Sequence, residues 1–243
     1  MTKEKETVII ILAAGKGTRM NSDLPKVLHL LNDKPLLAHV LDTSSIIKPK
    51  QVIVVVGYKK EMILKYFKSK DMIFVEQKKQ QGTADAIKYC LPNIENFNGN
   101  VLILSGDVPM ITYKSLKKLI GIHNSNNASA SLISAKLHNP TGYGRIIKNN
   151  RNQLIKIVEH KDATDIEKQI SEINSGIYIF NAKILKNIIP KIDNNNVQNE
   201  YYLTDIFNFI DEKDTSIHQI ENCNEIAGIN TIEQLKQLGE STQ

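Results

Sequence analysis

Glycines and cations follow the first apolar run of the chain, a combination that suits a phosphorylated ligand. The run Val8–Ile11 leads into "LAAGKGTRM", and Lys26 follows in "PKV". Gly15 and Gly17 lack a Cβ, so backbone N–H groups beside them approach phosphate oxygens closely. Arg19 and Lys26 add positive charge to the same segment. The pattern predicts a phosphate-binding loop, although it also fits a tight turn whose lysines are solvated.

Two common phosphate-binding motifs do not fit this loop. A Walker A loop reads GxxxxGK[ST] and a dinucleotide-binding loop reads GxGxxG, whereas this loop reads GxGTRM. Neither NAD binding nor a P-loop is therefore indicated. The sequence also has no convincing Ser/His/Asp or Cys/His arrangement, so catalysis by a protein nucleophile is not expected.

Strands and helices alternate through the first half of the chain. The runs that begin at Val8, Val52 and Val101 are apolar throughout, as expected of strands that helices cover on both faces. Ligands of open parallel sheets bind beyond the carboxyl ends of the strands, where the glycine-containing loop lies. The alternation predicts a Rossmann-like, doubly wound, mostly parallel α/β sheet. Strands are expected over 7–14, 51–57, 72–77 and 100–107, and helices over 36–46, 60–69 and 84–91.

The pattern changes after Asn127. The apolar runs are closer together and partly alternating, which predicts a mixed or antiparallel extension of the sheet. No linker rich in Pro, Gly or Ser interrupts the chain, so residues 1–243 are expected to form a single domain. Strands are expected over 128–137, 144–148, 154–159 and 175–181, and helices over 200–210 and 231–238.

Composition and charge argue against a membrane protein, a secreted protein and a nucleic-acid-binding protein. The 243 residues are 41% hydrophobic and 23% charged, and no apolar run approaches the roughly 20 residues that span a bilayer. The charged start "MTKEKET" lacks the features of a secretory signal, so a cytoplasmic protein without a membrane partner is expected. Cys90 and Cys223 are far apart and indicate neither a zinc site nor a disulfide. The lysines behind the net charge of +5 are scattered and accompany no nucleic-acid-binding motif, so no nucleic-acid partner is expected.

The segment "LAAGKGTRMNSDLPKVLHLL" closely resembles the opening signature of the sugar-nucleotide pyrophosphorylases. Further segments resemble successive motifs of the bacterial N-acetylglucosamine-1-phosphate uridyltransferases, which form the first half of a bifunctional enzyme of cell-wall precursor synthesis. The resemblance extends from Val8 to about Asn230. These segments are "EQKKQQGTADA", "LILSGDVPMI", "PTGYGRII", "IVEHKDAT", "INSGIYIF", "NEYYLTDI" and "AGINT".

The resemblance implies a fold of the nucleotide-diphospho-sugar transferase type and a reaction. UTP and N-acetylglucosamine 1-phosphate would give UDP-N-acetylglucosamine and pyrophosphate with the help of Mg²⁺. Such an in-line transfer depends chiefly on positioning and charge neutralisation. The nucleotide-binding half would be about 1–127 and the sugar-binding half about 128–243. The alternatives are a nucleotidyltransferase of different nucleotide or sugar specificity, and a catalytically silent regulatory domain of the same fold.

The resemblance also assigns roles to individual residues. Arg19 and Lys26 match catalytic positions that neutralise the transferring and leaving phosphates. Asp107 and Asn230 match ligands of Mg²⁺, for which one carboxylate and one amide suffice beside phosphate and water. From sequence alone, Asp107 also fits an N-cap or turn, and Asn230 the N-cap of helix 231–238. Matching nucleotide-binding positions are Leu12, Ala13, Ala14, Gly15, Lys26, Gln77, Gly82 and Thr83, and matching sugar-binding positions are Gly144, Glu159 and Asn174.

Three departures from the family are visible. Ser105 stands where the family commonly has a tyrosine, which removes an aromatic wall. Asp85 stands at a position where histidine is usual, and its negative charge is expected to weaken phosphate binding unless the side chain points away. Residues 1–243 contain no hexapeptide repeat of the kind that forms a β-helix, so no acetyltransferase activity is expected of these residues, and the oligomeric state stays open.

Overall fold

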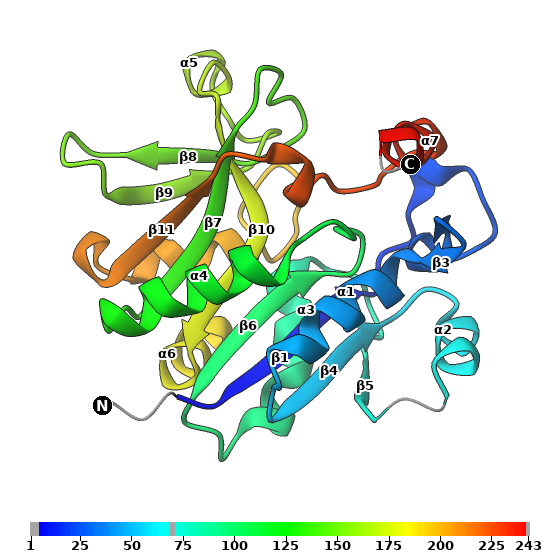
Figure 1. The fold of residues 1–243 in the computed structure, drawn as a ribbon. Helices are drawn as coiled ribbons and strands as arrows, with labels where there is room; N and C mark the ends of the chain where they lie inside the picture. Colours follow the sequence, from blue (N-terminus) through cyan, green and yellow to red (C-terminus); the bar gives the residue numbers. More distant parts are fainter. Residues whose placement is uncertain (1–4, 69–70, 242–243) are drawn as a thin grey trace.

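A twisted β-sheet with helices against both faces organises the computed structural model of the chain, which describes residues 5–68 and 71–241 (Figure 1). The strands that the first half contributes to this sheet are all parallel and lie in the order β6, β1, β4, β5. The predicted Rossmann-like parallel sheet is thereby confirmed. These strands are β1 (Thr7–Ala13), β4 (Gln51–Val56), β5 (Ile73–Glu76) and β6 (Asn100–Ser105).

The second half extends this sheet with strands of mixed direction. Strand β10 (Glu172–Asn181) lies antiparallel between β6 and β7 (Ala130–Lys136), and β11 (Thr215–Ile220) runs parallel to β7 at the edge. The antiparallel pair β8 (Arg145–Lys148) and β9 (Leu154–Val158) joins through β8 to β10. The predicted mixed extension is confirmed, and its strands continue the same sheet.

Helices cover the two faces of the sheet (Figure 1). On one face lie α1 (Leu36–Ile46) and α4 (Tyr113–Ser125), and on the other lie α3 (Thr83–Cys90) and α6 (Ala182–Ile188). No helix within the described ranges has the length and apolar character needed to cross a membrane. The remaining helices are α2 (Lys60–Tyr66), α5 (Asp165–Lys168) and α7 (Ile232–Ser241), and the 3₁₀ helices are Thr18–Met20, Lys26–Leu28, Leu91–Ile94, Ile189–Lys191, Leu203–Phe209, Glu212–Asp214 and Cys223–Ile226.

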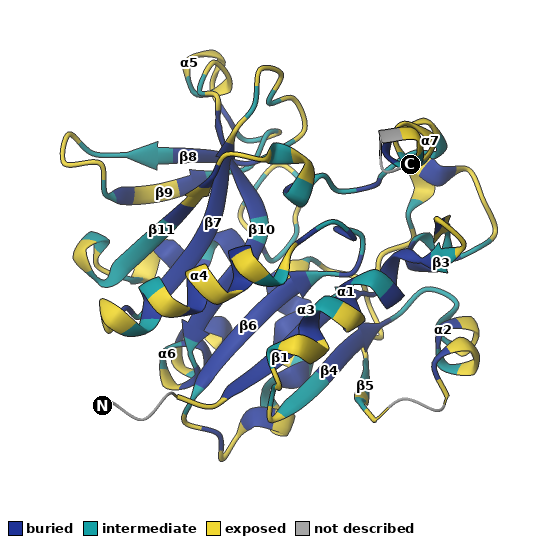
Figure 2. Ribbon diagram, in the orientation of Figure 1, coloured by how far each residue is buried: buried dark blue, intermediate teal, exposed yellow. Residues whose placement is uncertain are grey.

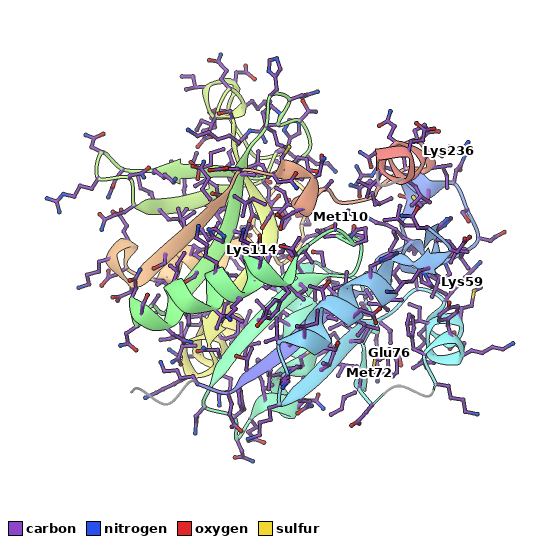
Figure 3. The ribbon with its side chains drawn as sticks, viewed as in Figure 1. Lys59, Met72, Glu76, Met110, Lys114 and Lys236 are labelled. Atoms are coloured by element: carbon purple, nitrogen blue, oxygen red, sulfur yellow. The ribbon has the colours of Figure 1, made fainter. Side chains whose placement is uncertain are left out.

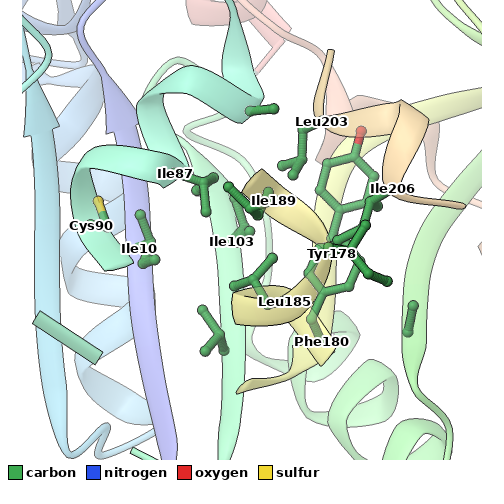
Figure 4. Packing of buried hydrophobic residues seen from close by; sticks show 14 of the residues in the cluster. Ile10, Ile87, Cys90, Ile103, Tyr178, Phe180, Leu185, Ile189, Leu203 and Ile206 are labelled. Atoms are coloured by element: carbon green, nitrogen blue, oxygen red, sulfur yellow. The ribbon is translucent and has the colours of Figure 1, made fainter. Parts of the chain in front are cut away.

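The central strands are apolar throughout because each contributes to a core on both faces. Along β1, Val8 and Ile10 pack into the cluster beneath α3 and α6, whereas Ile9 and Ile11 pack into the cluster beneath α1 and α4. This is the alternation of side chains expected along a strand. Figure 2 shows these strands as buried, and Figure 4 shows how Ile10 packs with residues of α3, α6 and β10.

A third apolar cluster ties the C-terminal helix to the loop after β1. Met20 and Leu31 pack there with Ile229 and with Leu238 of α7, and Met110, labelled in Figure 3, packs against them. A small β-hairpin of β2 (Leu30–Leu31) and β3 (Lys34–Pro35) lies beside α7. Residues more than 200 positions apart in sequence are thereby held side by side.

The helix predicted over 200–210 is confirmed only in part, as a 3₁₀ helix and not an α-helix. The chain from Glu200 to Tyr202 is not helical, and a 3₁₀ helix follows over Leu203–Phe209. The backbone of Tyr201 is committed to non-local partners, since its N–H donates to Gln81 O at 2.8 Å and its carbonyl accepts from Ala84 N at 2.8 Å. An α-helix that begins at Glu200 would have required the Tyr201 carbonyl for a bond within the segment.

Other differences concern elements that the sequence did not reveal. The edge strand β11 and the helices α4, α5 and α6 were not predicted. Helix α4 has a recognisable start, because Thr112 Oγ1 accepts from Ser115 N at 3.2 Å as an N-cap. The predicted helix 60–69 ends at Tyr66, and its position 69 lies outside the described residues.

Candidate active site

The glycine-containing loop lies at the carboxyl end of β1, as predicted. Gly17 has φ +62, and a Cβ there would lie 2.6 Å from the Cβ of Lys26. Any larger residue would therefore push Lys26 away as well as strain the backbone. The sequence places glycine where the chain folds back and brings Lys26 to the end of the sheet.

A cavity of about 340 Å³ opens beside this loop. It lies between the ends of β1 and β6 and the start of α3, which is the place that the parallel sheet predicts for a ligand. Its walls include Asp107 and every residue that the resemblance assigned to nucleotide binding, namely Leu12, Ala13, Ala14, Gly15, Lys26, Gln77, Gly82 and Thr83. We call it the nucleotide cavity.

The residues predicted for catalysis and metal binding meet at one edge of the nucleotide cavity. The Lys26 ammonium forms an ion pair with Asp107 and donates to Asn230 Oδ1 at 2.8 Å. Arg19 Nη2 donates to the same amide oxygen at 2.9 Å, although the two residues are 211 positions apart. The structure thus brings Arg19, Lys26, Asp107 and Asn230 together. We call this group the cation–acid cluster.

Asn230 is not the N-cap of the last helix. Thr231 has that place, because its Oγ1 accepts from Gln234 N at 3.2 Å while Gln234 Oε1 accepts from Thr231 N at 3.2 Å. The Asn230 side chain is instead turned to the cluster, and its Nδ2 donates to Gly228 O at 3.2 Å. The neighbouring backbone is held against the turn after β6, since Ile229 N donates to Asp107 O at 3.0 Å.

The donor set of the cation–acid cluster suits a hard divalent cation. A carboxylate oxygen of Asp107 and the amide oxygen of Asn230 both contact one ammonium group, so they already converge on a positive charge. Within the described residues, no group of three or more His, Cys, Asp or Glu side chains is arranged to hold a metal. Mg²⁺ favours such a site, because it takes few protein ligands and completes its coordination with phosphate and water oxygens.

At the opposite side of the nucleotide cavity, Gln77 and Gly82 are held together. Gln77 Nε2 donates to Gly82 O at 3.0 Å and to Asp85 Oδ2 at 2.8 Å. Gly82 has φ +117, and a Cβ there would lie 2.4 Å from Tyr201 O, so glycine is required. Asp85 is buried behind Gln77 and does not line the nucleotide cavity. The Asp85 side chain thus points away from the cavity, and its charge is not expected to weaken phosphate binding.

A second cavity, of about 210 Å³, adjoins the first. Gly144, Glu159 and Asn174, the residues predicted for sugar binding, all line it. Leu12, Thr83 and Ser105 line both cavities, so the two spaces meet at the ends of β1 and β6. We call it the sugar cavity. Ser105, where an aromatic wall was expected from the family, stands at this junction.

The polar groups of the sugar cavity are held by hydrogen bonds. Thr204 Oγ1 donates to Glu159 Oε1 at 3.0 Å, and Asn174 Nδ2 donates to Tyr178 Oη at 2.6 Å. Burial raises the pKa of the Glu159 carboxyl, the hydrogen bond from Thr204 lowers it, and nearby carboxylates, beginning with Asp205, raise it further. The cavity therefore combines an acidic acceptor with an amide that both donates and accepts.

Several residues near the two cavities were missed or left open by sequence reasoning. Gln80 and Glu200 line the nucleotide cavity, but polar residues in loops carry no distinguishing pattern. Arg145 is buried, and its guanidinium bonds Tyr143 O, Lys168 O and His160. These contacts identify Arg145 as a brace between β8 and the segment that carries Glu159.

Comparison with known proteins agrees with this geometry. The nucleotidyl transferase family matches residues 8–224. The chain is similar to the bifunctional protein GlmU of Alkaliphilus metalliredigens, with 45% identity over 96% of this chain and 51% of the relative. The GlmU of Streptococcus sanguinis is 42% identical over 91% of this chain and 48% of the relative. The chain spans about half the length of the curated relatives it matches.

Solved structures of low sequence identity share the fold. An apo UDP-glucose pyrophosphorylase superposes with a TM-score of 0.79 at 17% identity and covers 98% of both chains. A putative glucose-1-phosphate thymidylyltransferase from Bacillus anthracis gives a TM-score of 0.76 at 18% identity over 97% of this chain and 94% of the other. Since the family match covers nearly the whole parallel sheet and both cavities, the chain belongs to the nucleotidyl transferase family.

Proposed function

We propose that the chain transfers a uridylyl group from UTP to N-acetylglucosamine 1-phosphate and releases pyrophosphate. The observation that carries the proposal is the meeting of the nucleotide and sugar cavities at Leu12, Thr83 and Ser105, with the cation–acid cluster on one side. An in-line transfer needs two phosphorylated substrates in adjoining spaces with positive charge between them. The motifs shared with N-acetylglucosamine-1-phosphate uridyltransferases supply the identity of the substrates.

In this proposal, each part of the nucleotide cavity binds one part of UTP. Gln77 and Gly82 bind the uracil. Its imide N–H needs an acceptor, and the two carbonyls on either side of it need donors. The backbone of the Gly15 loop and the Lys26 ammonium bind the phosphates. The guanidinium of Arg19, which is a planar fork of donors, stabilises charge on the departing pyrophosphate. The two ends of the cavity thus hold the base and the triphosphate apart.

The acceptor substrate occupies the sugar cavity. Glu159 accepts hydrogen bonds from sugar hydroxyls, Asn174 binds the acetamido or hydroxyl groups, and the lack of a side chain at Gly144 leaves room for the ring. The phosphate of this substrate then points through the junction at Ser105 toward the nucleotide. The half 1–127 supplies most of the nucleotide cavity and the half 128–243 most of the sugar cavity, while Leu12, Thr83 and Ser105 line both.

We propose that Mg²⁺ is the cation and that Asp107 and Asn230 bind it. The ion would neutralise phosphate charge during the transfer. Asp107 supplies the charged ligand from the end of β6, and Asn230 supplies the neutral one from the segment before α7. Both substrates belong to the nucleotide and sugar phosphate pools of the cytoplasm, where we propose that the chain acts.

The test of this function is release of pyrophosphate from pairs of substrates. UTP, dTTP and CTP are each supplied with N-acetylglucosamine 1-phosphate or glucose 1-phosphate, with Mg²⁺ or with a chelator. We expect UTP with N-acetylglucosamine 1-phosphate to react fastest, and chelation to abolish the reaction. A faster reaction with another pair would assign a different specificity, and no release from any pair would favour a silent regulatory domain.

The half-buried Glu159 carboxylate of the sugar cavity is expected to affect stability and substrate binding in opposite ways. Because the folded state raises the pKa of Glu159, ionisation of this group opposes folding at neutral pH, and the opposition disappears as the pH falls toward its ordinary value of 4.5. We expect Glu159→Gln to melt at a higher temperature than the wild type at pH 8. The difference should shrink toward pH 4.5 when melting is followed by circular dichroism.

The same substitution should weaken binding of the sugar phosphate. A glutamine oxygen is a weaker acceptor than a carboxylate, so we expect the KM for N-acetylglucosamine 1-phosphate to rise about tenfold. The KM for UTP should stay the same, because Glu159 does not line the nucleotide cavity. An equal rise in both KM values would show that Glu159 does not act on the sugar.

A further inference from the structure

A buried carboxylate lies directly behind the amide that faces the nucleotide cavity. Asp85 is 9% exposed, and its Oδ2 accepts from Gln77 Nε2 at 2.8 Å, while the same nitrogen donates to Gly82 O at 3.0 Å. We infer that Asp85 is a positioning residue that holds the Gln77 amide in one orientation and thereby favours UTP over CTP. This inference rests on the proposed function, because it assumes that Gln77 contacts the base.

The contacts of Gln77 determine which end of its amide is presented to a ligand. A carboxylate and a backbone carbonyl are both acceptors, and an amide nitrogen has two hydrogens to donate. Both hydrogens are therefore used within the protein, and Oε1 is the end left for the base. Turning the amide over would place Oε1 against the oxygens of Asp85 and Gly82, which repel it.

The backbone of Gln77 is fixed by its own hydrogen bonds, so only its side-chain amide is free to turn over. Gln77 is 3% exposed, its N–H donates to Val56 O at 2.8 Å, and its carbonyl accepts from Gln80 Nε2 at 2.9 Å, so its backbone is fixed. Asp85 lines a separate cavity of about 90 Å³ on the far side, together with Lys88 of the same helix. Asp85 therefore acts on a nucleotide only through Gln77.

The orientation of the amide distinguishes the pyrimidine bases. Uracil and thymine carry a hydrogen on N3, which Gln77 Oε1 accepts. Cytosine has an unprotonated N3, whose lone pair would face that oxygen. The Gly82 N–H, which has no hydrogen-bond partner among the residues described, is a donor for a uracil carbonyl. A locked Gln77 thus selects bases with an N3 hydrogen.

The test compares the ratio of kcat/KM for UTP to that for CTP in variants of Asp85. Asp85→Leu keeps the branched shape of the side chain but has no acceptor, so the amide turns over more easily and we expect the ratio to fall about tenfold. Asp85→Asn keeps one oxygen acceptor without the charge, so its ratio should lie between those of the wild type and Asp85→Leu. Lys88→Ala is the control, because Lys88 is exposed on the same helix and should leave the ratio unchanged.

Binding measurements separate this inference from the proposed function. Calorimetry with UTP and CTP gives an affinity ratio that does not depend on turnover. Ratios that are the same in wild type, Asp85→Leu and Asp85→Asn would overturn the role of Asp85 while UTP turnover persists. Absence of turnover with every nucleotide in the wild type would instead overturn the proposed function. If Asp85→Leu does not fold, an unchanged ratio in Asp85→Asn alone overturns the inference.

Discussion

Turnover of an Asp107→Ala variant is expected to fall about 10²–10³-fold, the cost of losing one group that stabilises charge in the transition state. Asp107 lies in the turn directly after β6, lines the nucleotide cavity and pairs with Lys26. Alanine removes the charged ligand proposed for Mg²⁺, and Asn230 alone would then hold the ion. The measurement is pyrophosphate release from UTP and N-acetylglucosamine 1-phosphate at a series of Mg²⁺ concentrations.

Two further variants distinguish loss of a metal ligand from loss of structure. Asp107→Asn keeps an oxygen at the same place, so it should recover part of the activity at high Mg²⁺ concentrations, whereas Asp107→Ala should not. Asp211→Ala removes an exposed carboxylate that pairs with Lys213 at the surface, and it should match the wild type. An Asp107→Ala protein with unchanged turnover at limiting Mg²⁺ would refute the metal assignment.

The position of Asp107 could be predicted from sequence because it depends on a local rule. Its strand is a continuous apolar run, and the end of such a run in a parallel sheet faces the ligand. Asn230 follows no comparable rule, since it reaches the cluster from a segment 204 positions beyond Lys26. Only the resemblance to known enzymes identified it, whereas its local sequence suggested a helix cap that Thr231 provides instead.

Non-local pairing also explains what was mispredicted in the fold. The segment around Tyr201 has residues that suit a helix, but its backbone pairs with residues 81–84 and so helps to build the loop that carries Gly82. The edge strand β11 is short and polar on its exposed side, so its apolar pattern is weak. The direction of the Asp85 side chain depended on its contact with Gln77, which no spacing in the sequence encodes.

The ammonium of Lys26 occupies the point on which the proposed metal ligands converge, and this has two consequences. It pairs with Asp107 and donates to Asn230 Oδ1 at 2.8 Å, so the charge of Lys26 competes with a cation for both oxygens. During catalysis, the same charge is proposed to stabilise the phosphates. Loss of the ammonium should therefore slow the reaction and at the same time ease binding of the ion.

We accordingly expect Lys26→Met, which keeps the length of the side chain, to lower kcat about 10²–10³-fold. The Mg²⁺ concentration that gives half of the maximal rate should fall, because the competing cation is gone. Lys59→Met is the matched control, since Lys59, labelled in Figure 3, pairs with Asp23 and does not line the nucleotide cavity. If the Mg²⁺ requirement of Lys26→Met rises severalfold, Lys26 supports the metal ligands and does not compete for them. Slower catalysis together with a lower Mg²⁺ requirement is a combination that a general loss of folding would not produce.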